Sequence, residues 1–396
     1  MNLLSLLPVF FCALAASSHA AENADPANVK LAIDRAILPM MQQYGIPGMA
    51  VGITIDGKRY FHEYGVAYKE TRQPITSESL FEIGSISKTF TATLASQAQV
   101  KGNLSMLDNA SSHLPALRGS SFDHISLLNL ATHTSGGLPL QVPGDIDNAD
   151  QLMDYFKYWP PLQAAGTVRT YSNPGIGLLG MIAAKSMRMT FDDAIEKTLF
   201  PALGMRHSYL RVPPGQVRHY AQGYTKNDEP IRLSKGLLAS EAYGVKSSTV
   251  DMIRFIEANL QANLQASELR SELQRALFDT HTGHFQAGGM TQALVWERYP
   301  YPVALKQLLA GNSDAMVYQA TPTTGLSPEA QQSQQPAPAW INKTGATNGF
   351  AAYVAFVPSK KMGIVILANK NYPAAERVTA AYRILTELDK QAASLP

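Results

Sequence analysis

Cysteine is almost absent from this chain of 396 residues, and its one cysteine, Cys12, lies in the N-terminal segment MNLLSLLPVFFCALAASSHA. That segment is apolar, too short for an ordinary membrane-spanning helix, and ends in small residues. It is typical of a signal peptide over residues 1–20, cleaved after Ala20. No lipoprotein box surrounds Cys12, so no lipid anchor is predicted. An exported chain without disulfides must be stabilised by its core, and about 376 residues suffice for one.

Long apolar runs and an excess of one charge are missing as well. After residue 20 no apolar stretch approaches 18 residues, so we expect a soluble, globular, periplasmic protein. The chain has 33 basic and 31 acidic residues, a net charge of +2. This balance gives no electrostatic reason to expect nucleic acid or a membrane surface as a partner.

Two common catalytic patterns are absent too. No G-x-S-x-G nucleophile elbow occurs, which argues against a Ser-His-Asp hydrolase. His281 and His284 form the closest histidine pair, but no third ligand is suitably spaced, so neither a metal nor a cofactor is expected. His133 is expected to support a loop. Trp296 and Glu297 are interpreted as buried packing and a local ion pair.

Strand patterns occupy both ends of the chain, and helix patterns occupy the middle. Alternating residues flank Asp56-Gly57, a typical two-residue hairpin signal, and residues 349–370 predict two further strands. Apolar residues at helical spacing predict one helix ending at Gly45 and another after residue 373. Between residues 87 and 261 the helical period recurs, interrupted by Pro and Gly loops.

The economical fold is α/β (α+β), in which both ends join one antiparallel sheet flanked by N- and C-terminal helices, with an all-helical lobe inserted. We expect residues 21–80 and 300–396 to form a discontinuous α/β domain and residues 81–299 a mainly helical domain. The active site is expected in the cleft between them. Residues 311–339, rich in Pro, Gln, Ser and Thr, are expected to form a long irregular loop.

The segment GSISK places Ser85 three residues before Lys88, on one face of a helix, whereas Ser87 and Lys88 point about 100° apart. Near a helix N-terminus, Ser85 would have backbone N–H groups for a developing oxyanion. A lysine in a dry site can take the serine proton or position the group that does. Alone, the spacing is weak evidence, because a helix-start serine beside a solvated lysine explains it too.

Two distant segments strengthen the hypothesis. TYSNPG places Tyr171 and Asn173 in one short loop, and a phenol flanked by ammonium groups can exchange protons near neutral pH. INKTGATNGF places Lys343 at an apparent strand start, where it could meet a carboxylate or the tyrosine. Gly345 would allow a substrate close to the backbone, and the N–H of Ala346 could be a second oxyanion donor.

These three elements, in this order, resemble the class C (AmpC-type) serine β-lactamases, within the penicillin-recognising enzymes. The resemblance covers essentially the whole mature chain, including GIPGMAVGITIDGK, HTSGGLPLQVP, EAYGVKSS, INKTGATNGF and ILANKNYP. The middle element begins with Tyr and no E-x-x-L-N segment is present, which fits class C and not class A. The resemblance implies a β-lactamase/transpeptidase-like fold and a monomer. It also implies that the protein hydrolyses small β-lactams and so confers resistance.

The resemblance also assigns residue roles. It makes Ser85 the acylated nucleophile, Lys88 its hydrogen-bonded partner and Tyr171 the candidate general acid/base; whether Tyr171 or Lys88 is the base stays open. The N–H groups of Ser85 and Ala346 would form the oxyanion hole. The resemblance also makes Lys343 a catalytic residue. The implied substrate-binding residues are Gln141 and Asn173 at the amide side chain of the substrate, Tyr243 along the cleft, and Thr344 and Arg377, with Lys343, at the carboxylate; Gly345 and Asn371 belong to the binding site as well.

The chain departs from the family pattern at four positions, which bear on substrate preference: Asn348, Ala351, Ala352 and Ala374. Three alternatives stay open. A D,D-peptidase shares all three elements and differs in the rate of deacylation. An esterase on the same scaffold tends to lose the K-T-G element, which is intact here. A non-hydrolytic β-lactam sensor, from another class of protein, would remain acylated and usually needs a membrane tether.

Overall fold

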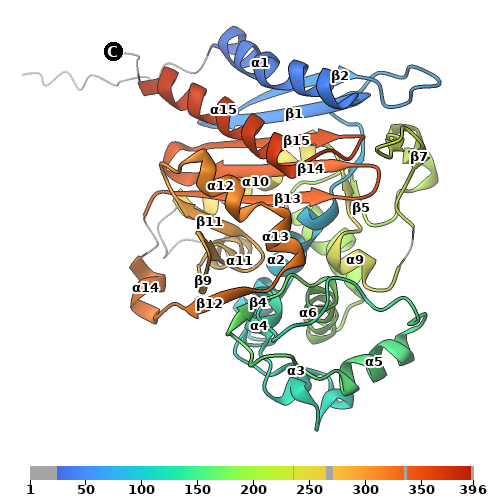
Figure 1. Cartoon of the computed structure of the whole chain (residues 1–396), viewed down its shortest axis with the longest axis vertical. Helices are drawn as coiled ribbons and strands as arrows, with labels where there is room; N and C mark the ends of the chain where they lie inside the picture. The colour runs from blue at the N-terminus through green and yellow to red at the C-terminus, as the bar shows by residue number, and fades with distance from the viewer. Residues whose placement is uncertain (1–24, 235, 265–270, 334–336, 394–396) are drawn as a thin grey trace, which may run out of the picture.

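A ten-stranded antiparallel sheet is the centre of the molecule (Figure 1), in a computed structural model that describes residues 25–234, 236–264, 271–333 and 337–393. Strands from both ends of the chain lie side by side in it, as the sequence pattern predicts. The strand order is β2 (Lys58–Gly65), β1 (Gly48–Ile55), β15 (Met362–Ala368), β14 (Ala351–Val357), β13 (Ala339–Ala346), β11 (Glu297–Pro300), β10 (Met290–Gln292), β9 (Phe285–Ala287), β12 (Thr321–Gly325) and β4 (Val168–Arg169).

The hairpin at Asp56-Gly57 is confirmed. Ile55 pairs with Lys58, so two residues make the turn. Asp56 and Gly57 both have positive φ values, 49° and 81°, which Asp and Gly tolerate better than other residues. The predicted strands near the C-terminus are β14 and β15, paired from Ala351–Ala368 to Val357–Met362.

Both faces of the sheet are covered, which explains why its central strands are apolar without a break. Helices α1 (Pro26–Tyr44) and α15 (Ala374–Ala393) pack together over one face. Each face of the sheet has its own hydrophobic core. Ile364 and Ile366 of β15 belong to the core under α1 and α15, and the alternate residues Val365 and Leu367 belong to the core on the opposite face. That second core is covered by helices α2 (Ser87–Val100), α10 (Thr249–Leu264) and α11 (Glu272–Thr280).

The helical part lies below the sheet in Figure 1. Short polar side chains begin several of its helices; Ser126, Asn148 and Ser172 each accept a backbone N–H as N-caps. Its helices are α3 (Ala110–His113), α4 (Leu127–Ala131), α5 (Ala149–Tyr158), α6 (Asn173–Ser186), α7 (Phe191–Asp193), α8 (Phe200–Ala202) and α9 (Ala239–Ala242). Two small sheets are formed by β3 (Phe81–Glu82), β8 (Lys246–Ser247) and β5 (Ser208–Tyr209), and by β6 (Gly223–Tyr224) with β7 (Pro230–Ile231), which lies beside the large sheet in Figure 1.

One expectation differs from the structure. The described part of residues 311–339 is not irregular, because it contains α13 (Asp314–Tyr318), β12 and α14 (Pro328–Ser333), after α12 (Leu305–Gly311). Strand β12 is held by backbone bonds to β9 and β4, which its composition does not reveal. The large sheet includes the strands from β9 at residue 285 onward. The division into two domains remains a prediction.

The sheet meets the helical part at one close approach. Strand β13 passes against the 3-10 turn Gly84–Ile86, which leads into α2. A Cβ on Gly345 would lie 2.0 Å from the carbonyl oxygen of Ile83, and a Cβ on Gly84 would lie 2.5 Å from the backbone nitrogen of Ala346. Only glycine allows the two segments to come this near.

We therefore expect Gly345→Ala to push β13 away from the turn and lower the free energy of unfolding by about 1–3 kcal/mol, as other overpacked sites do. Urea unfolding measures this, with Gly215→Ala as the control because nothing lies within 4 Å of a Cβ there. Equal stability of the two variants would contradict the close approach.

Candidate active site

Ser85 and Lys88 meet where the 3-10 turn passes into α2. Lys88 is completely buried, and its Nζ donates hydrogen bonds to Ser85 Oγ at 2.9 Å and to the Ala242 carbonyl at 2.8 Å. The Ser87 hydroxyl instead accepts from the backbone N–H of Val245 at 3.0 Å. Of the two serines in the segment, only Ser85 contacts Lys88.

Tyr171 lies in the loop between β4 and α6, with its ring buried among cations. The Nζ atoms of Lys88 and Lys343 each lie 5.1 Å from the ring centroid, and the Arg169 guanidinium carbon lies 5.3 Å from it. His133 stacks on the ring at 4.3 Å. The Tyr171 hydroxyl is buried and interacts with Ser85 and Lys88, although neither contact has the full geometry of a hydrogen bond.

The cations make this phenol unusually acidic. Burial alone would raise the pKa of Tyr171, but the positive charges of Lys343 and Lys88 outweigh it and lower the pKa from 10.0 to about 8. Burial lowers the pKa of Lys88 from 10.5 to about 8, although Tyr171 partly raises it. Two groups that can exchange a proton with a serine therefore titrate in the same range, close to Ser85.

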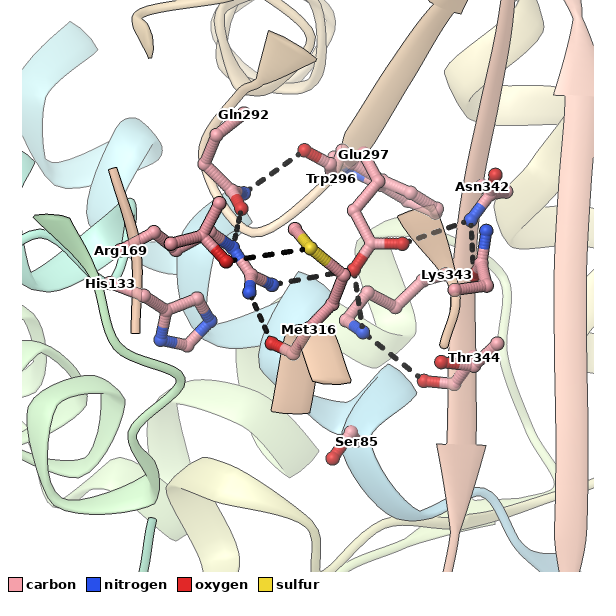
Figure 2. Close-up of polar contacts among 12 residues, drawn as sticks. Ser85, His133, Arg169, Gln292, Trp296, Glu297, Met316, Asn342, Lys343 and Thr344 are labelled. Atoms are coloured by element: carbon pink, nitrogen blue, oxygen red, sulfur yellow. Dashed lines mark hydrogen bonds and ion pairs between the residues drawn. The ribbon is translucent and has the colours of Figure 1, made fainter. Parts of the chain in front are cut away.

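Lys343 remains charged because a buried carboxylate faces it. Its Nζ lies 3.4 Å from Glu297 Oε1, and Asn342 Nδ2 donates to Glu297 Oε2 at 3.1 Å (Figure 2). Burial opposes the ammonium form, but Glu297 and Tyr171 outweigh it and raise the pKa of Lys343. Trp296 is buried, as expected. The ion pair of Glu297 is not local, however, because its partners come from β13 and β4.

His133 supports the loop, as expected. Its Nδ1 accepts the backbone N–H of Ser172 at 3.2 Å, and its φ is 61°. Burial, and then the charges of Arg169, Lys88 and Lys343, hold the pKa of His133 well below 6.5, so the ring is neutral. His281 is hydrogen-bonded to Asn259 and Asn263. The described residues contain no group of three or more His, Cys, Asp or Glu arranged to hold a metal ion.

The residues expected to bind substrate fall into two groups. In the first group, Asn173 follows Tyr171 by two residues in the chain, and its Nδ2 donates to Gln141 Oε1 at 2.9 Å. Tyr243 directly follows Ala242, whose carbonyl accepts a hydrogen bond from Lys88. Thr344, Gly345 and Ala346 continue β13 beyond Lys343.

Arg377 and Asn371 are not joined to this cluster by any hydrogen bond that the structure describes. Arg377 is buried on α15, where its guanidinium donates to the Tyr372 carbonyl at 3.1 Å and lies over the Tyr372 ring. Asn371 is partly exposed, between β15 and α15.

Several residues that line or support the site carry no recognisable sequence signal. Arg169 and Gln292 lie beside Glu297, and neither stands in a segment that the sequence singles out, whereas Asn342 lies in INKTGATNGF but has no role predicted from it. Glu82 accepts hydrogen bonds from the Thr347 hydroxyl and the Leu233 N–H, and so ties β3 to the residue that follows β13, close to the Gly84–Ala346 contact. The sequence gives one indication of the role of Arg169, which is that it precedes Tyr171 by only two residues.

The serine is partly exposed and its lysine partner is buried, beside a tyrosine between two ammonium groups, where an antiparallel sheet meets a helical region. Penicillin-recognising serine enzymes share this arrangement. The β-lactamase family model matches residues 33–388. A β-lactamase of Pseudomonas fluorescens is 49% identical over 363 residues, covering 92% of this chain and 99% of that protein.

Two solved structures agree with this assignment. A class C β-lactamase in complex with cefoxitin is 52% identical, covers 92% of this chain and 100% of that one, and superposes with a TM-score of 0.87. A β-lactamase/D-alanine carboxypeptidase from Pseudomonas syringae is 50% identical over 93% of this chain and 99% of that one, with a TM-score of 0.86. The chain belongs to the β-lactamase family and is a class C serine β-lactamase.

The lowered pKa values of Lys88 and Tyr171 predict an unusual pH dependence of stability. Below about pH 8 the folded protein carries the cost of a buried, charged Lys88, and this cost disappears as pH approaches 10.5. Tyr171 contributes stability above pH 10 that is lost as pH falls through about 8. Both groups therefore raise the free energy of unfolding between pH 8 and 10.

The stability of the native protein relative to Lys88→Met should rise by on the order of 2 kcal/mol between pH 7 and 10. Urea unfolding at both pH values measures this. Lys101→Met, at the exposed end of the same helix, is the control and should show no such change. An equal pH response of the two variants would contradict the assignment.

Proposed function

We propose that the protein hydrolyses the β-lactam amide bond of cephalosporins and penicillins through an acyl-enzyme on Ser85, and so confers β-lactam resistance. One observation carries this proposal: Lys88 Nζ is hydrogen-bonded to Ser85 Oγ, while the Tyr171 ring lies 5.1 Å from both Lys88 and Lys343. The partly exposed nucleophile and two buried groups with a pKa of about 8 thus share one site.

In acylation, Ser85 Oγ attacks the lactam carbonyl carbon and gives its proton to Tyr171 or Lys88. The carbonyl oxygen takes up negative charge, which the N–H groups of Ser85 and Ala346 stabilise. The C–N bond then breaks, and the lactam nitrogen receives a proton from the Tyr171–Lys88 pair. A water molecule attacks the resulting ester with the same pair as base, which releases the open acid and restores Ser85.

The proposed substrate contacts follow the chemistry of the side chains. Gln141 and Asn173, whose amides are already hydrogen-bonded to each other, offer donors and acceptors to the amide side chain of a β-lactam. Lys343 and Thr344 face the substrate carboxylate, with Gly345 leaving room beside the strand. Tyr243 borders the cleft, and we assign Asn371 and Arg377 to the carboxylate end on the family resemblance alone.

We propose that the protein acts as a monomer in the periplasm, after removal of the segment 1–20, and uses neither metal nor cofactor. That segment lies outside the described residues. Among the described residues, no helix is both long and apolar enough to cross a bilayer. The near balance of 33 basic and 31 acidic residues supports small molecules, not nucleic acid, as partners.

The choice of nucleophile is tested by labelling with a fluorescent penicillin. Ser85→Ala should abolish labelling and reduce hydrolysis by at least about a thousandfold, as loss of a catalytic nucleophile does. Ser87→Ala is the matched control and should be labelled, because its hydroxyl faces Val245. Labelling that survives Ser85→Ala would disprove the assignment.

Lys343→Ala should raise KM, lower kcat, or both, because it removes the charge that faces the substrate carboxylate and the Tyr171 ring. Steady-state hydrolysis of a cephalosporin measures both constants. Lys360→Ala, at an ion pair with Asp389 far along the chain, is the control. Kinetic constants equal to those of the control would exclude the proposed role.

A D-alanine carboxypeptidase activity is the second candidate, because the 50% identical relative from Pseudomonas syringae is described as both a β-lactamase and a D-alanine carboxypeptidase. Release of D-alanine from an acyl-D-Ala-D-Ala peptide tests it. Hydrolysis of β-lactams without this release would limit the protein to the first function. Slow ester hydrolysis alone would indicate an esterase, and a permanent penicillin adduct would indicate a sensor.

A further inference from the structure

Arg169 is a buried cation next to the site, and the proposed reaction assigns it no role. It lies on β4, two residues before Tyr171, and only 1% of its surface is exposed. Its Nε donates to Gln292 Oε1 at 2.7 Å, and its NH1 donates to the Met316 carbonyl on α13 at 2.5 Å. Figure 2 shows the guanidinium between these two contacts and Glu297.

Two cations share one carboxylate oxygen at this place. Glu297 Oε1 lies 3.4 Å from Lys343 Nζ and 3.7 Å from Arg169 NH2, while Glu297 Oε2 accepts from Asn342. All three charged side chains are almost completely buried, so water screens little of their interaction. The interaction of Lys343 with Glu297 therefore depends on how much of the negative charge of Glu297 is neutralised by Arg169.

We propose that Arg169 is a positioning residue that shares the charge of Glu297 with Lys343, which leaves the Lys343 ammonium available to Tyr171 and to the substrate carboxylate. The same guanidinium fastens α13 to this cluster through the Met316 carbonyl. This inference rests on the proposed function for the substrate contact, but the charge balance itself is a property of the free protein.

Charge accounting around Tyr171 supports this role. The charges that face its ring are Lys88 from α2, Lys343 from β13 and Arg169 from β4, while His133 from the loop after α4 is neutral. Glu297, from β11, acts on Tyr171 with a negative charge and opposes the two lysines. Without Arg169, Glu297 would act on both Tyr171 and Lys343 with its full charge.

A purely structural role is also possible for a buried arginine, since Gln292 in turn donates to the carbonyls of Ala293 and Trp296. The two roles predict different results. Loss of a structural contact lowers activity at every pH and for every substrate. Loss of charge sharing shifts the titration of Tyr171 and lowers activity most for substrates that have a carboxylate. Removing the charge of Glu297 as well should reverse both effects.

The first experiment needs no substrate, so its failure is distinct from failure of the proposed reaction. Tyrosine labelled with ¹³C at Cζ is incorporated, and the Tyr171 signal is identified by its absence in Tyr171→Phe. In Arg169→Gln the titration midpoint of Tyr171 should rise by about one pH unit, because Glu297 is left uncompensated. In Arg169→Gln combined with Glu297→Gln it should return toward the native value.

Arg169→Lys keeps the charge and should titrate as the native protein does, even though it loses the forked contacts to Gln292 and Met316. If Arg169→Gln does not fold, Arg169→Lys provides the test instead. A Tyr171 titration midpoint equal to that of the native protein supports charge sharing, and a midpoint raised by about one pH unit overturns the proposal. The matched control is Arg254→Gln, which removes an arginine paired with the buried Asp251 elsewhere. An unchanged midpoint in folded Arg169→Gln also overturns the proposal.

The second experiment concerns the substrate. For benzylpenicillin, Arg169→Gln should raise KM on the order of tenfold, the effect of weakening one charge-assisted contact. For the methyl ester of benzylpenicillin, which lacks the carboxylate charge, the rise should be much smaller. Equal losses for acid and ester, with no recovery on adding Glu297→Gln, would show that Arg169 is only structural.

Discussion

A single buried carboxylate, Glu297, is the group on which the electrostatics of the site depend. A carboxylate in this position would be very unfavourable without partners. Lys343, Arg169 and Asn342 all contact it, and they come from two different strands of the sheet. Because Lys343 is thereby kept charged, it can lower the pKa of Tyr171, which in turn lies over the Ser85–Lys88 pair. The chemistry of the serine is thus linked to an acid at the far side of the cluster.

The backbone supplies the second constraint, which is the close approach of β13 to the turn before α2. Gly345 and Gly84 let the strand pass close to Ile83, and Ala346 lies beside Gly84, the residue before Ser85. The Glu82 side chain accepts hydrogen bonds from Thr347, just after β13, and from Leu233. A chain without a disulfide thus fixes its site by packing two covered faces of one sheet and by a few buried polar contacts.

Much of this could be predicted from the sequence because the signals are local. The Asp56-Gly57 hairpin, the terminal helices and the three-residue spacing of Ser85 and Lys88 each depend on a few neighbouring residues. The combination of GSISK, TYSNPG and INKTG was specific enough to identify the family, which the comparisons confirm. Helical spacing also separated Ser85 from Ser87, in agreement with the observed hydrogen bonds.

The parts that could not be predicted depend on distant pairs. The partners of Glu297 are separated from it by 45 to 128 residues along the chain, and nothing near Arg169 or Gln292 marks them as buried. Strand β12 could not be predicted, because its Thr and Pro residues give no strand pattern and the strand is held by backbone pairing to β9 and β4. The sequence correctly predicted that Glu297 forms an ion pair. It wrongly predicted a partner nearby in the sequence, because the partners Lys343 and Arg169 are brought together only by the fold.

The most direct test of the account is the mass of the intact mature protein, followed from milliseconds to minutes after mixing with benzylpenicillin. The account predicts a mass gain of one penicillin molecule, located on Ser85, that decays to the free protein as the lactam is consumed. Consumption of the lactam with no adduct would contradict a serine acyl-enzyme, and an adduct that persists would contradict hydrolysis as the function.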